Sequence, residues 1–292
     1  MFKGQLVNEG NVTVAYGLDL AEDTSPVIHD NFGTIDIFLG QTLTLAASNS
    51  LTNHTGGTIE GEGTLDVSAS GVSFVNDGFL LPGGTAAGTL TIIGGSNTSF
   101  GASSEIEIDL NGEGISDQLQ INGAAPVTLG GKLRFNGSPT GQWDFLIAAA
   151  GLMGSFQTVE GTDLGGGTIL DVTETTTSAT VTLTVEARTA SILGTTAGES
   201  LTGTVSPDIV YADAGNDVID ITAGATDDIV FGGAGDDVIK TGTGFKRIVG
   251  GDGVDQIELI ASFDYRNFDG HQLEYVEVID LDDGLNLSLI HI

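Results

Sequence analysis

Aspartate recurs at a fixed place in a short repeat near the C-terminal end of the chain. Between residues 203 and 258 it holds the sixth place of a nine-residue unit, with one two-residue insertion. The aspartates in this place are Asp208, Asp217, Asp228, Asp237 and Asp255, and Lys246 stands there in the remaining unit. Carboxylates that recur at such a spacing are suited to bind a hard cation through oxygen.

An aliphatic residue accompanies each of these positions, which indicates a stack of short strands. It follows two places after the sixth position, as Val210, Ile219, Val230, Ile239, Ile248 and Ile257. Glycines, as in the segment GGAGDDVIK at 232–240, allow a tight turn with positive φ before each strand. One unit cannot bury its aliphatic residue alone, so units must stack and bring their aspartates above one another. Stacked carboxylates repel one another unless a cation lies between them, and calcium suits a flexible site of many oxygens.

The repeat resembles the calcium-binding nonapeptide of the RTX (repeats-in-toxin) proteins. In that family two nonapeptides make one turn of a parallel β-roll, so alternate units share a side. The resemblance implies calcium ions between Asp217 and Asp237 and between Asp237 and Asp255, with Asp237 shared by both sites. The loop glycines assigned to these sites are Gly215, Gly232, Gly233, Gly235, Gly250, Gly251 and Gly253.

The opposite side of such a roll would carry Asp208, Asp228 and Lys246, so the resemblance leaves only the pair Asp208 and Asp228 there as candidate calcium ligands. Its loops are degenerate, because Ser206 and Pro207 replace the glycine pattern and one of residues 225 and 226 is inserted. We expect the Lys246 ammonium to occupy the place of a missing ion. The alternative interpretation of the whole region is an acidic, loop-rich linker, but a coil does not require an aliphatic residue in every unit.

The composition limits the class of protein and its partners. The chain has 40 acidic and 8 basic residues and a formal charge of -32, which argues against nucleic acid or an anionic membrane surface as a partner. It has no cysteine, and 45 glycines against 5 prolines favour an all-β fold. No apolar run approaches the roughly 20 residues that cross a bilayer. The start lacks a signal-peptide pattern, so either secretion uses another signal or this start is internal.

A second, longer repeat occupies the N-terminal part of the chain. Turn signals begin at Asn8, Asn31, Asn53 and Asn76, and an alternating strand follows each of them. This period predicts a right-handed parallel β-helix with coils about 4.8 Å apart. The inward residues are expected to include Leu43, Leu45, Leu65, Val67, Leu90, Ile92, Trp143 and Phe145. We expect the asparagines to stack as a hydrogen-bonded ladder, the alternative being a sugar-binding row.

The segment LPGGTAAGTLTIIGG, from Leu81, and the strands after it resemble the closing repeats of autotransporter passenger β-helices. The resemblance covers residues 8–185 and implies architecture and surface display. The expected organisation is a β-helix over 1–187 with its last strand at 175–185, a connector at 188–202 and the roll at 203–260. Residues 261–286, which contain LEYVEVIDLDDGLN, would close the roll or begin another module. Residues 287–292 are either an amphipathic strand or a translated sequencing adapter.

Polysaccharide lyases and epimerases also use β-helices, sometimes with calcium rolls, so an enzyme is an alternative to a structural protein. Lys132 and Arg134 share a strand face, where a basic pair is commonly a salt-bridging or solubilising feature. His29 and His54 lie 25 residues apart, so they either hold a metal at one corner or are exposed turn histidines. The HExxH and GxSxG motifs are missing from the sequence.

The sequence therefore predicts a non-catalytic, calcium-binding structural module of a secreted or surface-displayed bacterial adhesin-like protein. Calcium would drive folding of the repeats outside the cell, because its sites do not exist in the unfolded chain. The expected partners are calcium and a host-surface or matrix glycan or protein. The alternative is a non-catalytic or accessory part of a β-helical polysaccharide lyase or epimerase.

Overall fold

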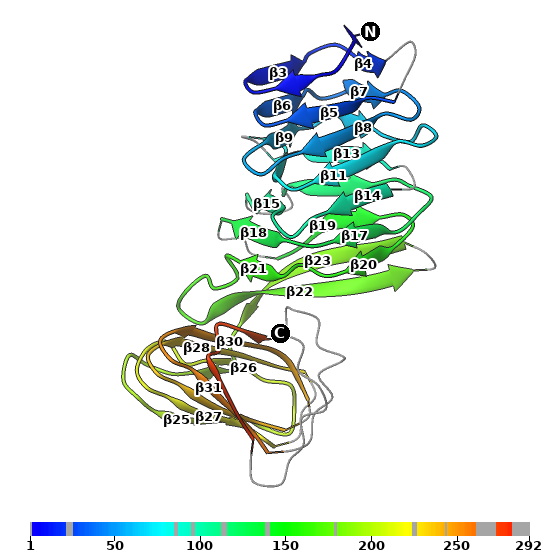
Figure 1. The fold of residues 1–292 in the computed structure, drawn as a ribbon. Coiled ribbons are helices and arrows are strands. Elements are labelled where there is room, and N and C mark those ends of the chain that lie inside the picture. The colour runs from blue at the N-terminus through cyan, green and yellow to red at the C-terminus, as the bar shows by residue number, and fades with distance from the viewer. Residues whose placement is uncertain are drawn as a thin grey trace. The chain divides into compact units, whose positions relative to one another are not determined.

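The chain forms β-strands throughout the part that a computed structural model describes. That part comprises residues 2–21, 26–84, 87–94, 97–111, 116–137, 141–177, 180–223, 227–242, 244–260 and 273–281. Within those ranges there is no helix of the length and apolar character needed to cross a membrane. The strands belong to two compact units, Met1–Thr162 with Leu170–Ala187 and Asp163–Ile169 with Arg188–Ile292 (Figure 1). The predicted all-β class is confirmed.

The first unit is a parallel β-solenoid with three sheets, because each coil from β1 to β21 contributes one strand to every sheet, and β22 and β23 extend one of the sheets. The nine-stranded sheet has the order β1 (Phe2–Lys3), β4 (Leu18–Ala21), β7 (Thr42–Leu45), β10 (Thr64–Asp66), β13 (Thr89–Ile93), β16 (Gln118–Ile121), β19 (Gln142–Ala148), β23 (Thr180–Thr189) and β22 (Thr168–Thr177). A seven-stranded sheet has the order β2 (Val7–Asn8), β5 (Ile28–Asn31), β8 (Ser50–Asn53), β11 (Ser73–Asn76), β14 (Asn97–Phe100), β17 (Val127–Leu129) and β20 (Leu152–Gly154). The third has the order β21 (Thr158–Glu160), β18 (Lys132–Asn136), β15 (Glu105–Asp109), β12 (Phe79–Pro82), β9 (Thr58–Gly61), β6 (Thr34–Ile37) and β3 (Asn11–Val14).

The core of this unit follows from the alternation of apolar and polar residues along each short strand. Leu43, Leu65 and Ile92 lie in register on three successive coils, and each is fully buried. All eight residues assigned to this core are buried in the structure: Leu43, Leu45, Leu65, Val67, Leu90, Ile92, Trp143 and Phe145. Burial of an apolar side chain of this size contributes roughly 2 kcal/mol, so stacking of the coils is the main source of stability.

The predicted asparagine ladder is present inside the first unit. The Asn8 side-chain amide donates to Oδ1 of Asn31 at 2.7 Å, and Asn31 donates to Oδ1 of Asn53 at 2.7 Å. Asn53 continues the ladder to Oδ1 of Asn76 at 2.6 Å. All four side chains are buried, so they are not a row that a sugar can reach. The ladder satisfies the polar groups of successive turns inside the solenoid.

The end of the first unit differs from the sequence prediction of a single strand at 175–185. β22 ends at Thr177 and β23 begins at Thr180, so the predicted strand spans parts of two strands. β23 pairs antiparallel with β19, whereas the strands from β1 to β21 pair in parallel with one another in the three sheets. Alternation alone could not locate this reversal, because both strands continue the same apolar and polar pattern.

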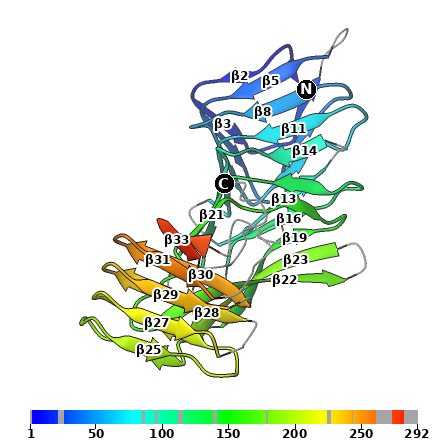
Figure 2. The ribbon, with the colours of Figure 1, turned by 60° about the horizontal axis from the view of Figure 1, so that its bottom comes forward.

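The second unit is a parallel solenoid of two five-stranded sheets (Figure 2). One sheet has the order β24 (Ile192–Leu193), β26 (Ile209–Tyr211), β28 (Asp228–Ala234), β30 (Phe245–Asp252) and β32 (Leu273–Glu274). The other has the order β25 (Ser200–Thr202), β27 (Val218–Ile221), β29 (Val238–Thr241), β31 (Gln256–Leu259) and β33 (Val278–Leu281). The six aliphatic residues of the repeat meet between the sheets and are at most 1% exposed: Val210, Ile219, Val230, Ile239, Ile248 and Ile257.

The roll extends beyond the boundaries expected from the nonapeptides at both ends. Residues 188–202, expected as a connector, contain β24 and β25, which pair with β26 and β27. In the expected closing segment, β32 and β33 pair with β30 and β31 and add a further turn. Residues 261–272 and 282–292, including the terminal LSLIHI, lie outside the described residues.

Candidate metal centre

Three aspartates line one edge of the roll, where the chain passes from one sheet to the other. Asp217 ends the loop between β26 and β27, Asp237 the loop between β28 and β29, and Asp255 the loop between β30 and β31. Their exposed fractions are 1%, 1% and 0%. The nine-residue spacing has therefore placed three carboxylates, one per turn, in the interior of the stacked loops.

The main chain orients each of these carboxylates. The Asp217 N–H donates to Oδ1 of Asp237 at 2.8 Å, and the Asp237 N–H donates to Oδ1 of Asp255 at 2.9 Å. Oδ1 of Asp217 in turn accepts the Glu199 N–H at 2.7 Å. One oxygen of each aspartate thus accepts a hydrogen bond from a main-chain N–H of the preceding turn. These N–H groups donate hydrogen bonds to the stacked carboxylates, and the bonds offset part of the repulsion between the negative charges.

The second oxygen of each carboxylate has no hydrogen-bond partner among the described residues. This holds for Oδ2 of Asp217, Asp237 and Asp255, and all three atoms are buried. A buried, unsatisfied carboxylate oxygen costs several kcal/mol unless a cation or a donor meets it. The three open oxygens lie on the side that the repeat pattern assigned to calcium, so the residues present fit that ion.

Glycine keeps the space beside these oxygens clear. A Cβ at Gly232 would lie 2.5 Å from Oδ2 of Asp237 and 2.5 Å from the carbonyl oxygen of Gly250. A Cβ at Gly250 would lie 2.6 Å from Oδ2 of Asp255 and would overlap the carbonyl oxygen of Tyr275. Gly232 and Gly250 therefore each leave a carboxylate oxygen and a carbonyl of the next turn facing the same small volume.

The remaining loop glycines are required by backbone conformation and close stacking. Positive φ values are found at Gly215 (112°), Gly233 (105°), Gly235 (132°), Gly251 (119°) and Gly253 (142°). A side chain at Gly233 would overlap the carbonyl oxygen of Asp213, and one at Gly251 would overlap that of Gly233. Of the seven glycines assigned from the sequence, Gly215, Gly235 and Gly253 lie in the loops, and the other four lie near the ends of β28 and β30. Each has a steric reason to be glycine.

Burial and repulsion from neighbouring acids raise the free energy of the ionised form of the three carboxylates. Burial, reinforced by the charges of Asp255 and Asp217, raises the pKa of Asp237 from 3.8 to about 6. Burial also raises the pKa of Asp217 and of Asp255, against the opposing effect of the hydrogen bonds from the main chain. A divalent cation would relieve this penalty at neutral pH.

The opposite edge of the roll differs in its hydrogen bonding. Asp208 and Asp228 are buried there, and the Asp208 N–H donates to Oδ1 of Asp228 at 2.8 Å. Both oxygens of Asp208 have partners, because Oδ1 accepts the Ser191 hydroxyl and Oδ2 accepts the Thr204 N–H. Around Lys246 the register shifts, since Asp228 pairs with Phe245 and Ile229 with Arg247. The replacement of an ion by the Lys246 ammonium therefore stays a prediction.

Two glutamates extend the stack of acids beyond the predicted aspartates. Glu199 stands one turn before Asp217, and both of its oxygens accept hydrogen bonds from Thr195. Glu277 stands one turn after Asp255 and accepts the Asp255 N–H at 2.8 Å. Sequence reasoning missed both residues because it followed aspartate alone. Glu199 lies 18 residues before Asp217, which is a detectable signal of one turn.

One acid per turn is too few to coordinate a metal through side chains alone. No group of three or more histidine, cysteine, aspartate or glutamate side chains placed to hold a metal occurs among the described residues. Calcium takes six to eight oxygens and accepts backbone carbonyls readily. The loop carbonyls between the aspartates are the additional ligands that this arrangement offers.

A comparison with protein families supports this chemistry. The model of the RTX calcium-binding nonapeptide repeat (4 copies) matches residues 193–224, 220–245 and 232–258. The roll contains RTX calcium-binding repeats. The RTX match includes Asp217, Asp237 and Asp255 and stops before Glu277. A comparison with curated proteins finds no match for the chain.

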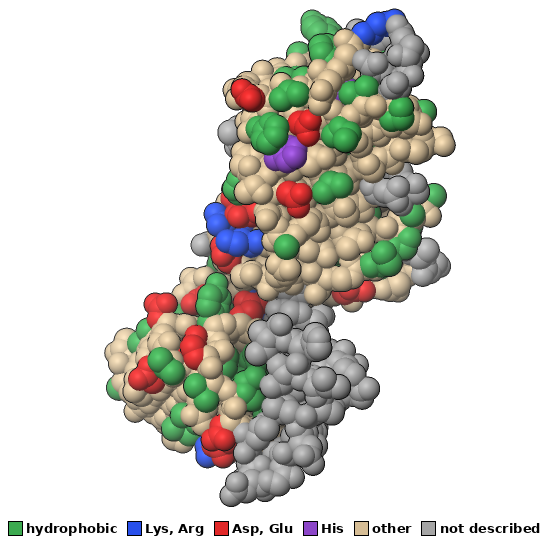
Figure 3. All heavy atoms as spheres, in the orientation of Figure 1, with side chains coloured by type: hydrophobic (Ala, Val, Ile, Leu, Met, Phe, Trp, Pro, Cys, Tyr) green, Lys and Arg blue, Asp and Glu red, His purple; other side chains and the backbone are tan. Residues whose placement is uncertain are grey.

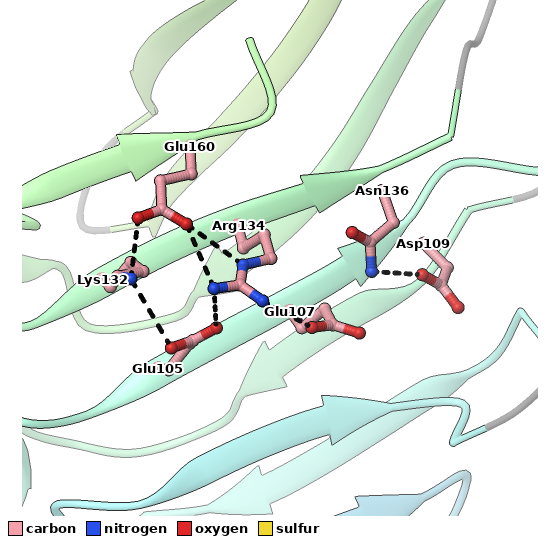
Figure 4. Close-up of polar contacts among 7 residues, drawn as sticks. All are labelled: Glu105, Glu107, Asp109, Lys132, Arg134, Asn136 and Glu160. Carbon is pink, nitrogen blue, oxygen red and sulfur yellow. Dashed lines mark hydrogen bonds and ion pairs between the residues drawn. The ribbon is translucent and has the colours of Figure 1, made fainter.

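The basic pair of the first unit lies in an ion-pair network on β15, β18 and β21 (Figure 4). Lys132 lies 2.7 Å from Glu160, and Arg134 lies 3.1 Å from both Glu105 and Glu160. Hydrogen bonding to the Lys132 ammonium, together with the charge of Arg134, lowers the pKa of Glu160. The salt-bridging interpretation of this pair is confirmed by these contacts.

The two histidines do not occupy equivalent positions on successive coils, since His29 pairs with Leu51 rather than with His54. His29 is fully buried, and its Nδ1 accepts the Leu6 N–H at 3.1 Å, so it is not an exposed turn residue as one alternative expected. His54 is partly exposed, with Nε2 2.8 Å from Oδ1 of Asp30 and its ring stacked on Phe32. Histidine atoms reach the surface of this unit beside acidic and hydrophobic side chains (Figure 3).

Proposed function

We propose that the roll is a calcium-dependent folding module of a secreted or surface-displayed adhesin-like protein. The observation that carries the proposal is the set of three buried Oδ2 atoms, on Asp217, Asp237 and Asp255, that lack a hydrogen-bond partner. Calcium would be held by these oxygens and by carbonyls of the adjacent loops. Bound there, it supplies positive charge that offsets the repulsion between stacked carboxylates.

Calcium availability would then decide where the module folds. Extracellular calcium modules have dissociation constants of about 10⁻⁴ to 10⁻³ M, well above cytosolic calcium concentrations. The roll would remain poorly structured inside a cell and fold after export, because an ion that binds only the folded chain stabilises it by mass action. The formal charge of -32 favours attraction of cations throughout this process.

Amide hydrogen exchange of the whole chain, with calcium and then with a chelator, tests this role. Amides of β27, β29 and β31 should gain protection with calcium, since these strands begin directly after the three aspartates. Amides of β7, β10 and β13 in the first unit serve as the internal control and should not respond. Equal protection of the roll in chelator and in calcium would refute calcium-dependent folding.

The adhesive part of the proposal rests on the first unit. Its exposed large hydrophobic side chains, within the described residues, are concentrated near the N-terminus: Phe2, Val7, Tyr16, Ile28, Phe32, Phe38 and Leu39, with Met153 apart from them. The side chains near the N-terminus lie on or directly after the first two coils, and exposed apolar side chains are suited to contact a partner. Binding to a host glycan or matrix protein should weaken in Leu39→Ser and persist in the control Met153→Ser, without turnover of the ligand. Equal binding by the two variants would count against this surface.

We also propose that the chain is not itself an enzyme. The basic pair best suited to neutralise an anionic sugar, Lys132 and Arg134, is engaged with Glu105 and Glu160. Measurable depolymerisation or epimerisation of an acidic polysaccharide by the purified chain would overturn this part of the proposal.

A further inference from the structure

The last described turn of the roll repeats the geometry of the predicted calcium sites without the nonapeptide sequence. Tyr275 and Glu277 lie between β32 and β33, where the preceding turn has the glycine loop that ends at Asp255. Ile248 pairs with Leu273 and Ile257 with Ile279, so this short connection spans the same edge as that loop. The RTX match ends at residue 258 and does not include it.

The carboxylate of Asp255 faces this turn with one oxygen unused. Asp255 is 0% exposed, and its Oδ2 is a buried atom without a hydrogen-bond partner in the described residues. Its Oδ1 is occupied by the Asp237 N–H at 2.9 Å. Asp255 Oδ2 is therefore a buried carboxylate oxygen that a cation would stabilise, as are the corresponding oxygens of Asp217 and Asp237.

The carbonyl oxygen of Tyr275 occupies the place that Gly250 fills one turn earlier. A Cβ built on Gly232 meets Asp237 Oδ2 and the Gly250 carbonyl, and a Cβ built on Gly250 meets Asp255 Oδ2 and the Tyr275 carbonyl. Tyr275 adopts a φ of 51°, a left-handed conformation that is unfavourable for a bulky residue. Gly232 and Gly250 have no positive φ, so the last turn brings this carbonyl to the corresponding place through a different backbone conformation.

Glu277 supplies a second carboxylate next to Asp255, and the two ends of the acid stack are not equivalent. Glu277 accepts the Asp255 N–H through one oxygen, at 2.8 Å, as each aspartate does for the turn before it. At the opposite end both oxygens of Glu199 are engaged by Thr195. Both oxygens of Glu199 are thus engaged, whereas only one oxygen of Glu277 is engaged among the described residues.

We propose that Asp255, Glu277 and the Tyr275 carbonyl form a further calcium site at the last turn of the roll. This inference rests on the proposed calcium role of the repeats and adds one ion to the two that the nonapeptides predict on this edge. Occupation of the site would link residues 273–281 to the roll, because β33 begins directly after Glu277.

Calcium stoichiometry of the full chain, measured by equilibrium dialysis with radioactive calcium, tests the site in matched variants. Glu277→Gln keeps an oxygen that can accept the Asp255 N–H but removes the charge, and it should bind one calcium fewer than the wild type. Glu199→Gln removes the same charge at the closed end and should keep the wild-type count. Amide exchange of β33 should lose its calcium response in Glu277→Gln and retain it in Glu199→Gln.

Terbium, which replaces calcium in oxygen sites, gives a second readout through tyrosine-sensitised emission. Tyr275→Phe keeps the carbonyl ligand, so it should retain the calcium count and lose part of the emission, while Glu277→Gln should lose part of both. A calcium count unchanged in Glu277→Gln overturns this site alone. A wild-type chain that binds no calcium overturns this site together with the proposed function.

Discussion

Replacement of Asp237 by Asn should change the stability of the roll in opposite senses with and without calcium. Asp237 is buried, and its pKa is raised from 3.8 to about 6 in the folded chain. The folded state therefore binds the Asp237 proton more tightly than the unfolded state does. Protonation of Asp237 stabilises the folded roll, and this stabilisation is fully present below about pH 4. It is lost as the pH rises through the folded pKa of about 6.

The magnitude follows from that difference in pKa. A rise of roughly 2 units corresponds to about 3 kcal/mol that the ionised Asp237 costs the calcium-free roll at pH 7. Asp237→Asn removes the charge, so without calcium the variant should be more stable than the wild type by up to about 3 kcal/mol at pH 7 and by less than about 1 kcal/mol at pH 4. Calcium at 100 times its dissociation constant stabilises the wild type by about 2.7 kcal/mol per site. Loss of both sites that share Asp237 should outweigh the gain of about 3 kcal/mol, so with calcium the wild type should be more stable than the variant.

Amide exchange free energies in β29 and β31 of the full chain provide the assay. The matched control is Asp252→Asn, which removes the same charge from an exposed side chain in a neighbouring loop. The control should show neither the gain in chelator nor the loss of calcium response. The reasoning fails if Asp237→Asn is no more stable than the wild type in chelator at pH 7, or if its advantage is as large at pH 4.

Three further outcomes follow from the structure. Gly233→Ala should abolish the calcium response of the roll, measured by amide exchange, because its Cβ would overlap the Asp213 carbonyl at a φ of 105°; Gly242→Ala, where no atom lies within 4 Å of the Cβ, is the control. Asn53→Ala should lower the free energy of unfolding of the first unit by about 2 to 4 kcal/mol in urea titrations, because buried Asn76 Oδ1 loses its donor and Asn31 Nδ2 loses one of its acceptors. A loss below about 1 kcal/mol would contradict the ladder's role. Lys246→Asp should raise the calcium stoichiometry, and an unchanged count in dialysis would remove the idea that the ammonium replaces an ion.

The sequence by itself determined the features that repeat with every turn. The spacing of Asp217, Asp237 and Asp255 predicted one edge of the roll, and the asparagine spacing predicted the buried ladder that begins at Asn8. Both follow from a single physical reason, since a solenoid stacks equivalent residues of successive turns directly above one another. The inward aliphatic residues followed from the same periodicity, and all six of the roll are buried.

The tertiary structure alone decided what the carboxylates contact and where the roll ends. Periodicity could not show that a main-chain amide of the preceding turn occupies Oδ1 of each aspartate and leaves Oδ2 open. Nor could it include Glu277, because the last turn has a different sequence and fewer residues between Leu273 and Ile279 than lie between their partners Ile248 and Ile257. His29 was also misjudged, since strand register rather than residue type placed it inside the first unit. These features depend on hydrogen bonds between distant segments, which exist only when the turns are stacked.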